Sequence, residues 1–326
     1  MAGKQMESIL SIKGLQVDLL STRGVVHAVR GINLDISKGE IHGFVGESGC
    51  GKTMAAKTIL RLHDEKRTQY AGEITFNGNS DILKFNKNQL QELRGKSISM
   101  VFQDPMVSLN PLLTVGEQIT EILCVHIGMK KTDAKDKAIS LLEKVGIHPA
   151  DRRFEQYPFE FSGGMLQRMM IAIAIACNPQ LIIADEPTTA LDVTIQAQIL
   201  ELLKDLQKST GMSILFITHN FGVVAEICNR VSVMYAGKIV ETGDVKSIFR
   251  HPTHPYTKAL LDSIPKSGQH GKRLVTIPGS PPELYRTING CSYAPRCGYV
   301  TEKCTLLDPQ ATYTQDGHIC LCHNNL

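Results

Sequence analysis

The sequence predicts an α/β fold with a mainly parallel sheet. Between about residues 8 and 250, short apolar runs rich in β-branched residues alternate with segments of helical periodicity, which is the pattern of an α/β domain. A glycine-rich loop, GESGCGKT at 46–53, lies between an apolar run and a helical segment. Near residue 250 the composition changes, and a polar link at 266–273 precedes a cysteine-rich tail. We therefore expect a large domain over 1–250 and an extension over 251–326.

Four apolar runs are expected to form strands that are buried on both faces of the sheet. They are EIHGFVG (40–46), SISMVFQ (97–103), QLIIAD (180–185) and SILFITH (213–219). Continuous apolar runs of this length are typical of parallel strands covered by helices. Residues 104–165 break the alternation with long stretches of helical spacing. This segment is predicted to be a helical insertion between two core strands.

The composition is that of an ordinary globular protein, with 42% hydrophobic and 21% charged residues. The net charge of +3 is small and does not indicate nucleic-acid binding. The sequence has neither an uninterrupted apolar run of 18 residues nor a basic-then-apolar amino terminus. We expect a chain without a membrane span or a secretory signal, located in the cytosol.

The loop at 46–53 satisfies the phosphate-binding pattern G-x-x-x-x-G-K-[ST] in the strand–loop–helix context that this motif requires. Its glycines allow backbone N–H groups to turn toward phosphate oxygens, and the following helix presents its positive end. Lys52 is expected to reach the β- and γ-phosphates, and the Thr53 hydroxyl to bind Mg²⁺. The predicted nucleotide-binding residues of the loop are Gly46, Glu47, Ser48, Gly49, Cys50, Gly51, Lys52 and Thr53. Cys50 is interpreted as a size-matched replacement for serine.

Three further strand ends present polar side chains. The strand LIIADE places Asp185 and Glu186 at its end, where Asp185 can hold hydrated Mg²⁺ and Glu186 can polarise an attacking water. Two acids at such a position are otherwise often helix caps. Gln103 and His219 are delivered in the same way by the strands before them, and His219 could sense the γ-phosphate.

A second glycine turn, FSGGM at 161–165, lies far downstream of the first. Ser162 is predicted to be the N-cap of the helix that follows, and exposed N–H groups at such a helix start favour an anion. Taken alone, the turn predicts no more than a capped helix.

The ordered set of motifs resembles the nucleotide-binding subunits of ATP-binding-cassette (ABC) proteins, over roughly residues 8–250. The resemblance implies a P-loop NTPase fold of the RecA-like type with a helical subdomain at about 104–165. In that family the signature turn contacts ATP held by the opposite subunit. Ser162, Gly163 and Gly164 would therefore bind the partner's γ-phosphate, and two such domains would enclose two ATP molecules with Mg²⁺.

Two features depart from the family pattern. The signature is usually L-S-G-G-Q, whereas Phe161 and Met165 stand at its ends here. The family usually stacks an aromatic residue on adenine from a strand before the P-loop. The corresponding region of this chain, GVVHAV at 24–29, offers Val25, Val26 or His27 instead.

The later part of the chain resembles the D-type ATPase subunits of dipeptide and oligopeptide ABC importers. The likeness rests on HPTHPYTKALL (251–261), QDPMVSLNPLLTVGEQI (103–119) and ADEPTTALDVTIQAQIL (184–200). It implies an ATPase that is peripheral on the cytoplasmic side of the cell membrane. The implied partners are two separate permease subunits, docked around QDPMVSLNP, a related non-identical ATPase subunit and an extracellular peptide-binding protein.

Five of the nine cysteines lie within the last 36 residues, which in a cytosolic chain favours metal over disulfides. The spacing C-x5-C-x6-C-x17-C of Cys291, Cys297, Cys304 and Cys322 is neither a usual ferredoxin spacing nor a zinc C-x2-C pair. The similar tails of peptide importers imply a [4Fe–4S] cluster; Zn²⁺ and unliganded thiols are alternatives. Cys320 or His323 could replace Cys322. Arg296 could offset thiolate charge or be a solvated surface residue.

Two other functions compete with peptide import. One is an ABC importer of nickel or a metallophore, because the ATPase never touches the transported substrate. The other is a soluble ABC ATPase of DNA repair or translation, but such chains usually contain a long coiled coil or two cassettes in tandem. This sequence contains neither feature.

Overall fold

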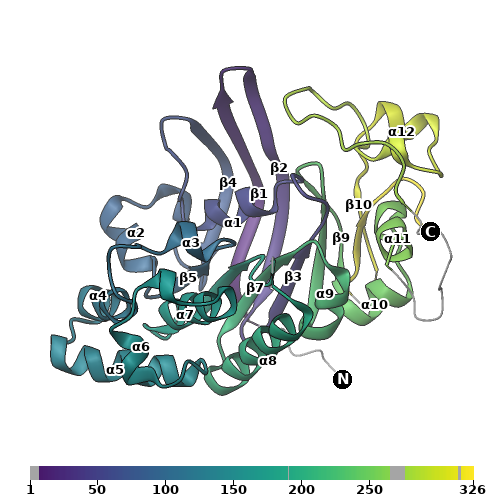
Figure 1. Ribbon diagram of the computed structural model, residues 1–326. Helices are drawn as coiled ribbons and strands as arrows, with labels where there is room; N and C mark the ends of the chain where they lie inside the picture. The colour runs from purple at the N-terminus through teal and green to yellow at the C-terminus, as the bar shows by residue number, and fades with distance from the viewer. Residues whose placement is uncertain (1–6, 190, 265–275, 315–316) are drawn as a thin grey trace. The chain divides into compact units, whose positions relative to one another are not determined.

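The computed structural model describes residues 7–189, 191–264, 276–314 and 317–326, so the predicted polar link lies outside the described residues. The chain divides into two compact units. The first combines Met1–Lys84 with Ile217–Leu326, and the second is Phe85–Phe216. Figure 1 labels their helices and strands. The division at residue 250 that the sequence suggests stays a prediction.

An antiparallel three-stranded sheet opens the first unit. Its strand order is β2-β1-β4, with β1 at Ser8–Ser21, β2 at Gly24–Ser37 and β4 at Thr68–Phe76. These strands were not predicted separately from the mainly parallel sheet. A two-residue turn joins β1 to β2, and such a short connection requires antiparallel strands.

The other sheet of the first unit contains the strand that leads into the glycine-rich loop. β3 (Ile41–Val45) pairs in parallel with β8 (Arg230–Tyr235), as the buried apolar run predicted. The strands β9 (Lys238–Asp244), β11 (Ile319–Leu321) and β10 (Ala311–Tyr313) follow in antiparallel order. The cysteine-rich tail is therefore part of this sheet.

Short helices complete the first unit. They are α1 (Lys52–Ile59), α9 (Phe221–Ile227), α10 (Val245–Arg250), α11 (Pro255–Asp262) and α12 (Glu302–Leu306), with the 3-10 turns η1 (Ile82–Lys84) and η3 (Ala294–Arg296). α11 and η3 both begin with a proline in the first turn, where its missing N–H costs nothing.

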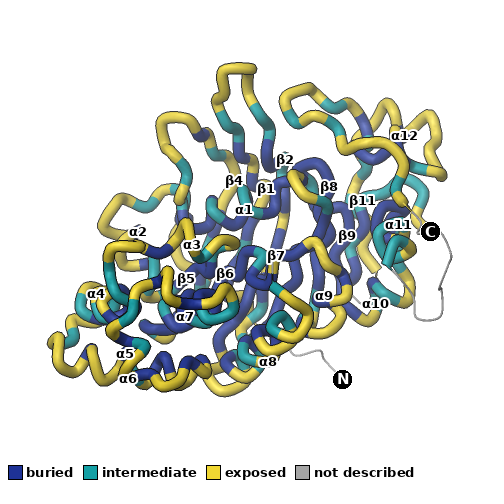
Figure 2. Tube along the Cα trace, viewed as in Figure 1, coloured by how far each residue is buried: buried dark blue, intermediate teal, exposed yellow. Residues whose placement is uncertain are grey.

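The second unit holds the other predicted core strands. β5 (Ile98–Val101) pairs in parallel with β6 (Leu181–Asp185), and β7 (Ser213–Thr218) lies next to β6. All residues of these three strands are buried, as Figure 2 shows in dark blue. The chain leaves this unit within β7, at Phe216.

The chain between β5 and β6 is helical, and its last helix continues beyond the predicted bound of about residue 165. It contains α3 (Pro105–Ser108), α4 (Val115–Ile127), α5 (Lys131–Lys144), α6 (Ala150–Phe154), the 3-10 turn η2 (Pro158–Glu160) and α7 (Gly163–Ile175). A capping box of Thr114 and Glu117 starts α4, and Gly128 ends it in the left-handed conformation. α2 (Lys87–Leu93) and α8 (Val193–Thr210) flank the insertion in sequence.

Three tyrosines anchor the tail to the core of the first unit. The ring centroid of Tyr235 lies 4.5 Å from that of Tyr256 and 5.3 Å from that of Tyr293. All three side chains belong to one buried cluster with valines of β8 and β9. The tail thus shares the core of the first unit, although its own sequence has few large apolar residues. Nowhere in the described parts of the chain is a helix both long and apolar enough for a bilayer.

Candidate functional site

The glycine-rich loop connects β3 to α1, as predicted, and two of its glycines are sterically required. A Cβ atom on Gly46 would lie 2.1 Å from the carbonyl oxygen of Met234. A Cβ atom on Gly51 would lie 2.3 Å from the carbonyl oxygen of Ala28, and Gly51 has a φ of +109°. Only glycine tolerates both the contact and the backbone angle. The loop is therefore held tightly against the backbone of the first unit.

Lys52 is folded back onto its own loop. Its ammonium group donates to the carbonyl oxygens of Gly46 at 2.7 Å and Glu47 at 3.0 Å, and the residue is 4% exposed. Cys50 is buried beside it, and burial raises the pKa of the Cys50 thiol. A protonated, buried thiol is a poor nucleophile. The role of Cys50 as a small filling group fits this environment.

Glu47 makes contacts with the extension over 251–326 that the motif did not reveal. Its backbone N–H donates to the Tyr256 hydroxyl at 3.0 Å, and its carboxylate accepts two bonds from the Arg296 guanidinium at 2.7 and 3.0 Å. The Arg296 side chain is 4% exposed, so its interpretation as a solvated surface residue is wrong. Its charge is matched by Glu47 rather than by thiolates. Hydrogen bonding to Glu47 raises the pKa of Arg296.

In the second unit, the ends of β5 and β6 bring Gln103 and Glu186 together. Asp185 is the last residue of β6 and is 2% exposed. The Glu186 carboxylate accepts a bond from the Thr189 hydroxyl at 2.8 Å and one from the Gln103 amide at 3.4 Å. Glu186 has a φ of 46°, an unfavourable backbone for a residue with a Cβ. Such strain is typical of functional positions.

The second glycine turn starts α7, and Ser162 is its N-cap as predicted. The Ser162 side chain makes no capping hydrogen bond, however, and both Ser162 and Gly163 are exposed. A Cβ atom on Gly164 would lie 2.7 Å from Cγ2 of Ile195 in α8, so this glycine permits close packing. The turn keeps an exposed helix start rather than a self-capped one.

The sequence-predicted site residues are distributed over both units. The loop 46–53 and His219 belong to the first unit; Gln103, Asp185, Glu186 and the turn 162–164 belong to the second. His219 directly follows β7 and is exposed. His27, one of the residues that stand near the usual adenine-stacking position, forms a bond of 2.8 Å with Asp18.

Three of the four predicted cluster cysteines have polar contacts at their sulfurs. Backbone N–H groups donate to the sulfurs of Cys297 at 3.4 Å and Cys322 at 3.3 Å, and the Cys304 sulfur lies 3.3 Å from the Thr301 hydroxyl. The Cys291 N–H donates to the Cys304 carbonyl at 2.8 Å. N–H···S contacts of this kind surround the thiolates of iron–sulfur centres.

The thiols are close enough to influence one another electrostatically. Burial, and then the charges of Cys291, Cys297 and Cys304, raise the pKa of Cys322. Within the described ranges, no group of three or more His, Cys, Asp or Glu residues could hold one metal ion.

Two rival ligands have other surroundings. Burial raises the pKa of Cys320 to about 12, and its sulfur lies near the Glu241 carboxylate as well as near Cys322 and Cys291. The His323 ring is bonded to the carbonyl oxygen of Leu307 at 2.8 Å. The charges of all three other thiols named by the spacing raise the pKa of Cys322.

Comparisons with known proteins agree with the motifs. The family model described as ABC transporter matches residues 29–189, and that described as oligopeptide/dipeptide transporter, C-terminal region, matches residues 240–304. The dipeptide transport ATP-binding protein DppD of Bacillus subtilis is 47% identical over 97% of this chain and 95% of that protein. The chain belongs to the ABC transporter family.

Further similarities support the same assignment. The oligopeptide transport ATP-binding protein OppD of Bacillus subtilis is 49% identical over 95% of this chain and 87% of that protein. A dimeric ATP-binding cassette bound to ADP and phosphate is 27% identical, with a TM-score of 0.65 over 72% of this chain and 98% of that one. This ATPase therefore has the P-loop NTPase fold of ABC nucleotide-binding domains, as expected, and it hydrolyses ATP.

Proposed function

We propose that this ATPase powers the import of dipeptides or longer oligopeptides through separate permease subunits. The observation that carries the proposal is the joint match to the ABC ATPase core and to the oligopeptide/dipeptide transporter C-terminal region. The relatives named DppD and OppD span nearly the whole chain at 47% and 49% identity. As in other ABC importers, the subunit is peripheral on the cytoplasmic side of the cell membrane.

The first unit supplies the phosphate contacts. The backbone of residues 46–53 and the start of α1 surround the phosphates, and Lys52 moves from its own carbonyls to the β- and γ-phosphate oxygens. Thr53 and the buried Asp185 are oxygen donors of the kind that Mg²⁺ prefers, with Gln103 as a further oxygen donor. When bound, Mg²⁺ neutralises charge on the β- and γ-phosphates.

Hydrolysis is assigned to Glu186. Its carboxylate, held by Thr189 and Gln103, orients a water for attack on the γ-phosphorus and accepts a proton from it. The P–O bond to the β-phosphate breaks, and ADP and phosphate leave. His219, exposed after β7, senses the γ-phosphate. The strained backbone of Glu186 is consistent with a side chain placed for chemistry.

The second glycine turn completes the site of a partner subunit. Ser162, Gly163 and Gly164 leave an exposed, uncapped helix start, which is suited to the γ-phosphate of an ATP held elsewhere. Two ATPs would lie between two ATPase subunits. The partner is a related, non-identical chain. ATP binding closes this dimer, and hydrolysis reopens it.

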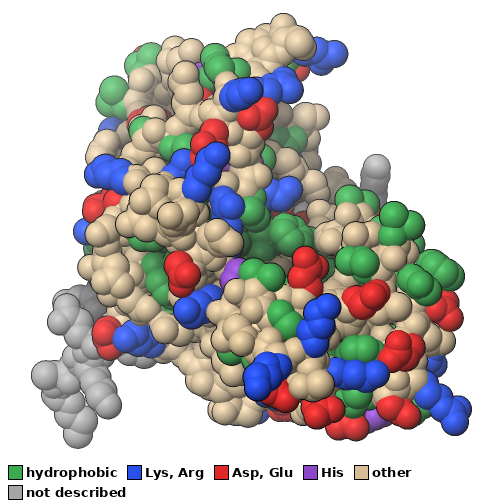
Figure 3. Space-filling view, turned by 90° about the vertical axis from the view of Figure 1, so that its left-hand side faces the viewer, with side chains coloured by type: hydrophobic (Ala, Val, Ile, Leu, Met, Phe, Trp, Pro, Cys, Tyr) green, Lys and Arg blue, Asp and Glu red, His purple; other side chains and the backbone are tan. Residues whose placement is uncertain are grey.

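The helical insertion is the proposed permease contact. A groove of about 500 Å³ is lined by Leu113, Cys124, Val125 and Phe154, with Glu117, Glu121, Lys131 and Lys135 among the residues at its wall. Figure 3 shows this side of the molecule, where hydrophobic side chains lie among acidic and basic ones. Met106 and Val107 of α3 are 58% and 83% exposed. A short amphipathic helix of a permease fits such a surface.

We also propose that Cys291, Cys297, Cys304 and Cys322 hold a [4Fe–4S] cluster. The support is the N–H···S contacts of Cys297 and Cys322, together with the partial or full burial of all four cysteines. Anaerobically purified protein should absorb near ~400 nm and contain about four irons per chain. Zinc in a colourless protein would favour the alternative, and Cys320→Ser should leave the metal content unchanged where Cys322→Ser lowers it.

Uptake assays in the source cell test the transport assignment. Deleting the gene should abolish uptake of a labelled dipeptide or tripeptide, and the wild-type chain should restore it whereas Glu186→Gln should not. Uptake of radioactive nickel, with and without a metallophore, is measured in parallel. Loss of nickel uptake with unchanged peptide uptake would assign the chain to the metal branch and overturn the peptide proposal.

A further inference from the structure

The geometry points to a positioning function of the extension over 251–326: Arg296 and Tyr256 hold Glu47, and with it the backbone of the loop at 46–53, in the conformation that binds ATP. We infer that ATP affinity depends on the integrity of this clamp, which we define as Glu47, Tyr256 and Arg296. The inference rests on the proposed contact of Lys52 with the phosphates. All four residues belong to the first unit.

Arg296 is built into the clamp rather than resting on it. Besides its two bonds to the Glu47 carboxylate, its Nε donates to the carbonyl oxygen of Pro278 at 2.8 Å. Nη1 also lies 3.3 Å from the Tyr235 hydroxyl, and the guanidinium is 5.7 Å from the centre of that ring. A planar, paired guanidinium of this kind fixes its partner in one orientation.

The contact reaches the catalytic lysine in one step. Glu47 is fixed at its N–H by Tyr256 and at its carboxylate by Arg296, and its own carbonyl oxygen accepts a bond from the Lys52 ammonium. The carbonyl of the preceding residue, Gly46, accepts a second bond from Lys52. The clamp therefore fixes the loop carbonyls that hold Lys52 before ATP binds.

Arg296 also removes a charge that would oppose ATP. The Glu47 side chain is only 26% exposed and stands in the loop that surrounds the phosphates. Without its partner, this carboxylate would repel the polyphosphate at short range in a partly buried setting. The clamp thus has a geometric and an electrostatic effect, both of which favour ATP binding.

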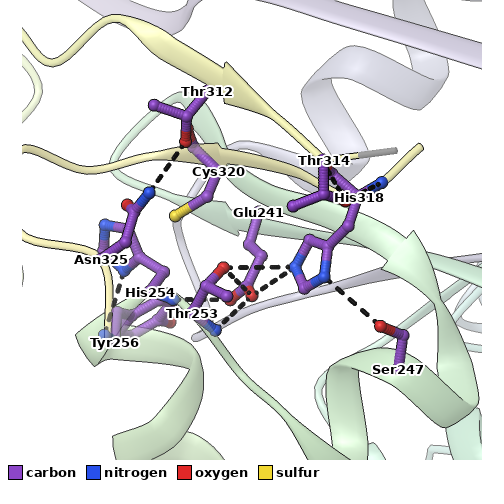
Figure 4. A network of polar contacts seen from close by, with 10 residues as sticks. All are labelled: Glu241, Ser247, Thr253, His254, Tyr256, Thr312, Thr314, His318, Cys320 and Asn325. Atoms are coloured by element: carbon purple, nitrogen blue, oxygen red, sulfur yellow. Dashed lines mark hydrogen bonds and ion pairs between the residues drawn. The ribbon is translucent and has the colours of Figure 1, made fainter. Parts of the chain in front are cut away.

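Tyr256, the second residue that holds Glu47, is connected to the tail by the polar network in Figure 4. The Tyr256 N–H donates to Nδ1 of His254 at 3.0 Å. The fully buried Glu241 of β9 accepts bonds from the N–H groups of Thr253 and His254 and from the His318 ring, at 2.7, 3.2 and 2.7 Å. Because His318 belongs to the tail, the positions of Tyr256 and Arg296 both depend on how the tail folds.

The cysteines lie directly next to Arg296 in the sequence. Arg296 stands between Ala294 and Cys297 at the end of η3, and the Cys297 N–H donates to the Ala294 carbonyl at 3.2 Å. The Cys291 N–H is bonded to Cys304 at the other end of the same segment. Loss of order at these cysteines should therefore release Arg296 from Glu47.

The test is a double-mutant cycle read by ATP affinity of the full-length protein. Arg296→Met should raise the Kd for ATP about tenfold, since a paired carboxylate becomes unpaired beside the phosphates. Glu47→Gln should raise it only a fewfold. The double variant should bind ATP more tightly than Arg296→Met alone, and Arg296→Lys should recover part of the affinity because it keeps the charge without the fork.

Matched variants separate this proposal from the assignment of the ATP site. Arg286→Met removes an exposed arginine of the same tail and should leave the Kd unchanged. If Lys52→Ala does not weaken ATP binding, the proposed site itself is wrong. If Lys52→Ala weakens it and folded Arg296→Met binds like the wild type, or if the cycle is additive, the clamp is overturned.

A cysteine variant extends the test to the whole tail. Cys297→Ser should raise the Kd for ATP to about the value of Arg296→Met, and should add little when combined with it, because both act on one pair. Circular dichroism and limited proteolysis verify that the ATPase core stays folded. An unchanged Kd in Cys297→Ser protein whose tail has become protease-sensitive would show that the tail does not position the loop.

Discussion

The phosphate loop and the cysteine-rich tail differ in how much of their structure can be predicted from the sequence. The structure of the loop can be predicted locally, because a short motif between a strand and a helix predicts its backbone. Gly46 and Gly51 meet atoms that exclude any side chain. For the tail, the cysteine spacing indicates a chemistry, but the sequence does not indicate how the tail packs. Its residues Tyr293 and Arg296 nonetheless contact the same unit as the loop.

This difference shows that separation along the chain is a poor guide to functional independence. The nucleotide motifs all precede residue 220, and the sequence favours a tail that could be changed without consequence for ATP. In the structure β11 pairs with β9, and Arg296 reaches Glu47, which lies 249 residues earlier. The tail thus contacts the loop directly.

The largest expected effect lies at Glu186, which should separate the two regions completely. Glu186→Gln should lower ATP turnover at least about a hundredfold, because it removes the group that accepts the proton of water. ATP affinity and iron content should stay as in the wild type. Steady-state phosphate release and nucleotide titration check both statements, and wild-type turnover in this variant would refute the assignment of Glu186.

Much of the ATPase core was predictable from the sequence, and the reasons are physical. Buried parallel strands are continuous apolar runs, so β3, β5, β6 and β7 could be located within one or two residues. The antiparallel pairing of β1 and β2 was missed because an apolar run does not reveal its direction. The pairing of Arg296 with Glu47 was missed because an ion pair across 249 residues leaves no local signal.

The next effect concerns the glycine turn, and it requires two subunits. A chain with Ser162→Arg should keep ATP binding at its own loop, while the site on the partner's loop loses ATP-dependent closure, because a large cation blocks the exposed helix start. Photolabelling of each subunit with an ATP analogue distinguishes the two sites. Loss at the chain's own loop with an intact partner site would contradict action in trans.

An intermediate effect should appear in acid, at the network that fastens the tail. Burial lowers the pKa of His254 to about 4, although the nearby Glu241 opposes the shift. The unfolded chain, with a histidine pKa of about 6.5, binds this proton more readily than the folded one. Stability is therefore complete above about pH 6.5 and declines as the pH falls toward 4, by up to about 3 kcal/mol.

A matched variant isolates this titration. His254→Asn retains an acceptor for the Tyr256 N–H but cannot be protonated, so its free energy of unfolding should vary less between pH 6.5 and 4 than that of the wild type. Denaturant titrations at several pH values provide the comparison. Equal slopes for the two proteins would mean that His254 is not the group responsible for the loss of stability.

The smallest effect is expected at an exposed contact of the tail, and it sharpens the comparison by contrast with Arg296. Lys238 and Asp308 form an ion pair of 2.8 Å, with side chains 20% and 51% exposed. Water and salt screen such a pair, so Lys238→Met should lower the free energy of unfolding by less than about 1 kcal/mol. The Kd for ATP should not change, because neither residue touches Glu47 or Tyr256. If this variant weakened ATP binding as much as Arg296→Met, any disturbance of the tail would reach the loop, and the specific path through Arg296 would lose its support.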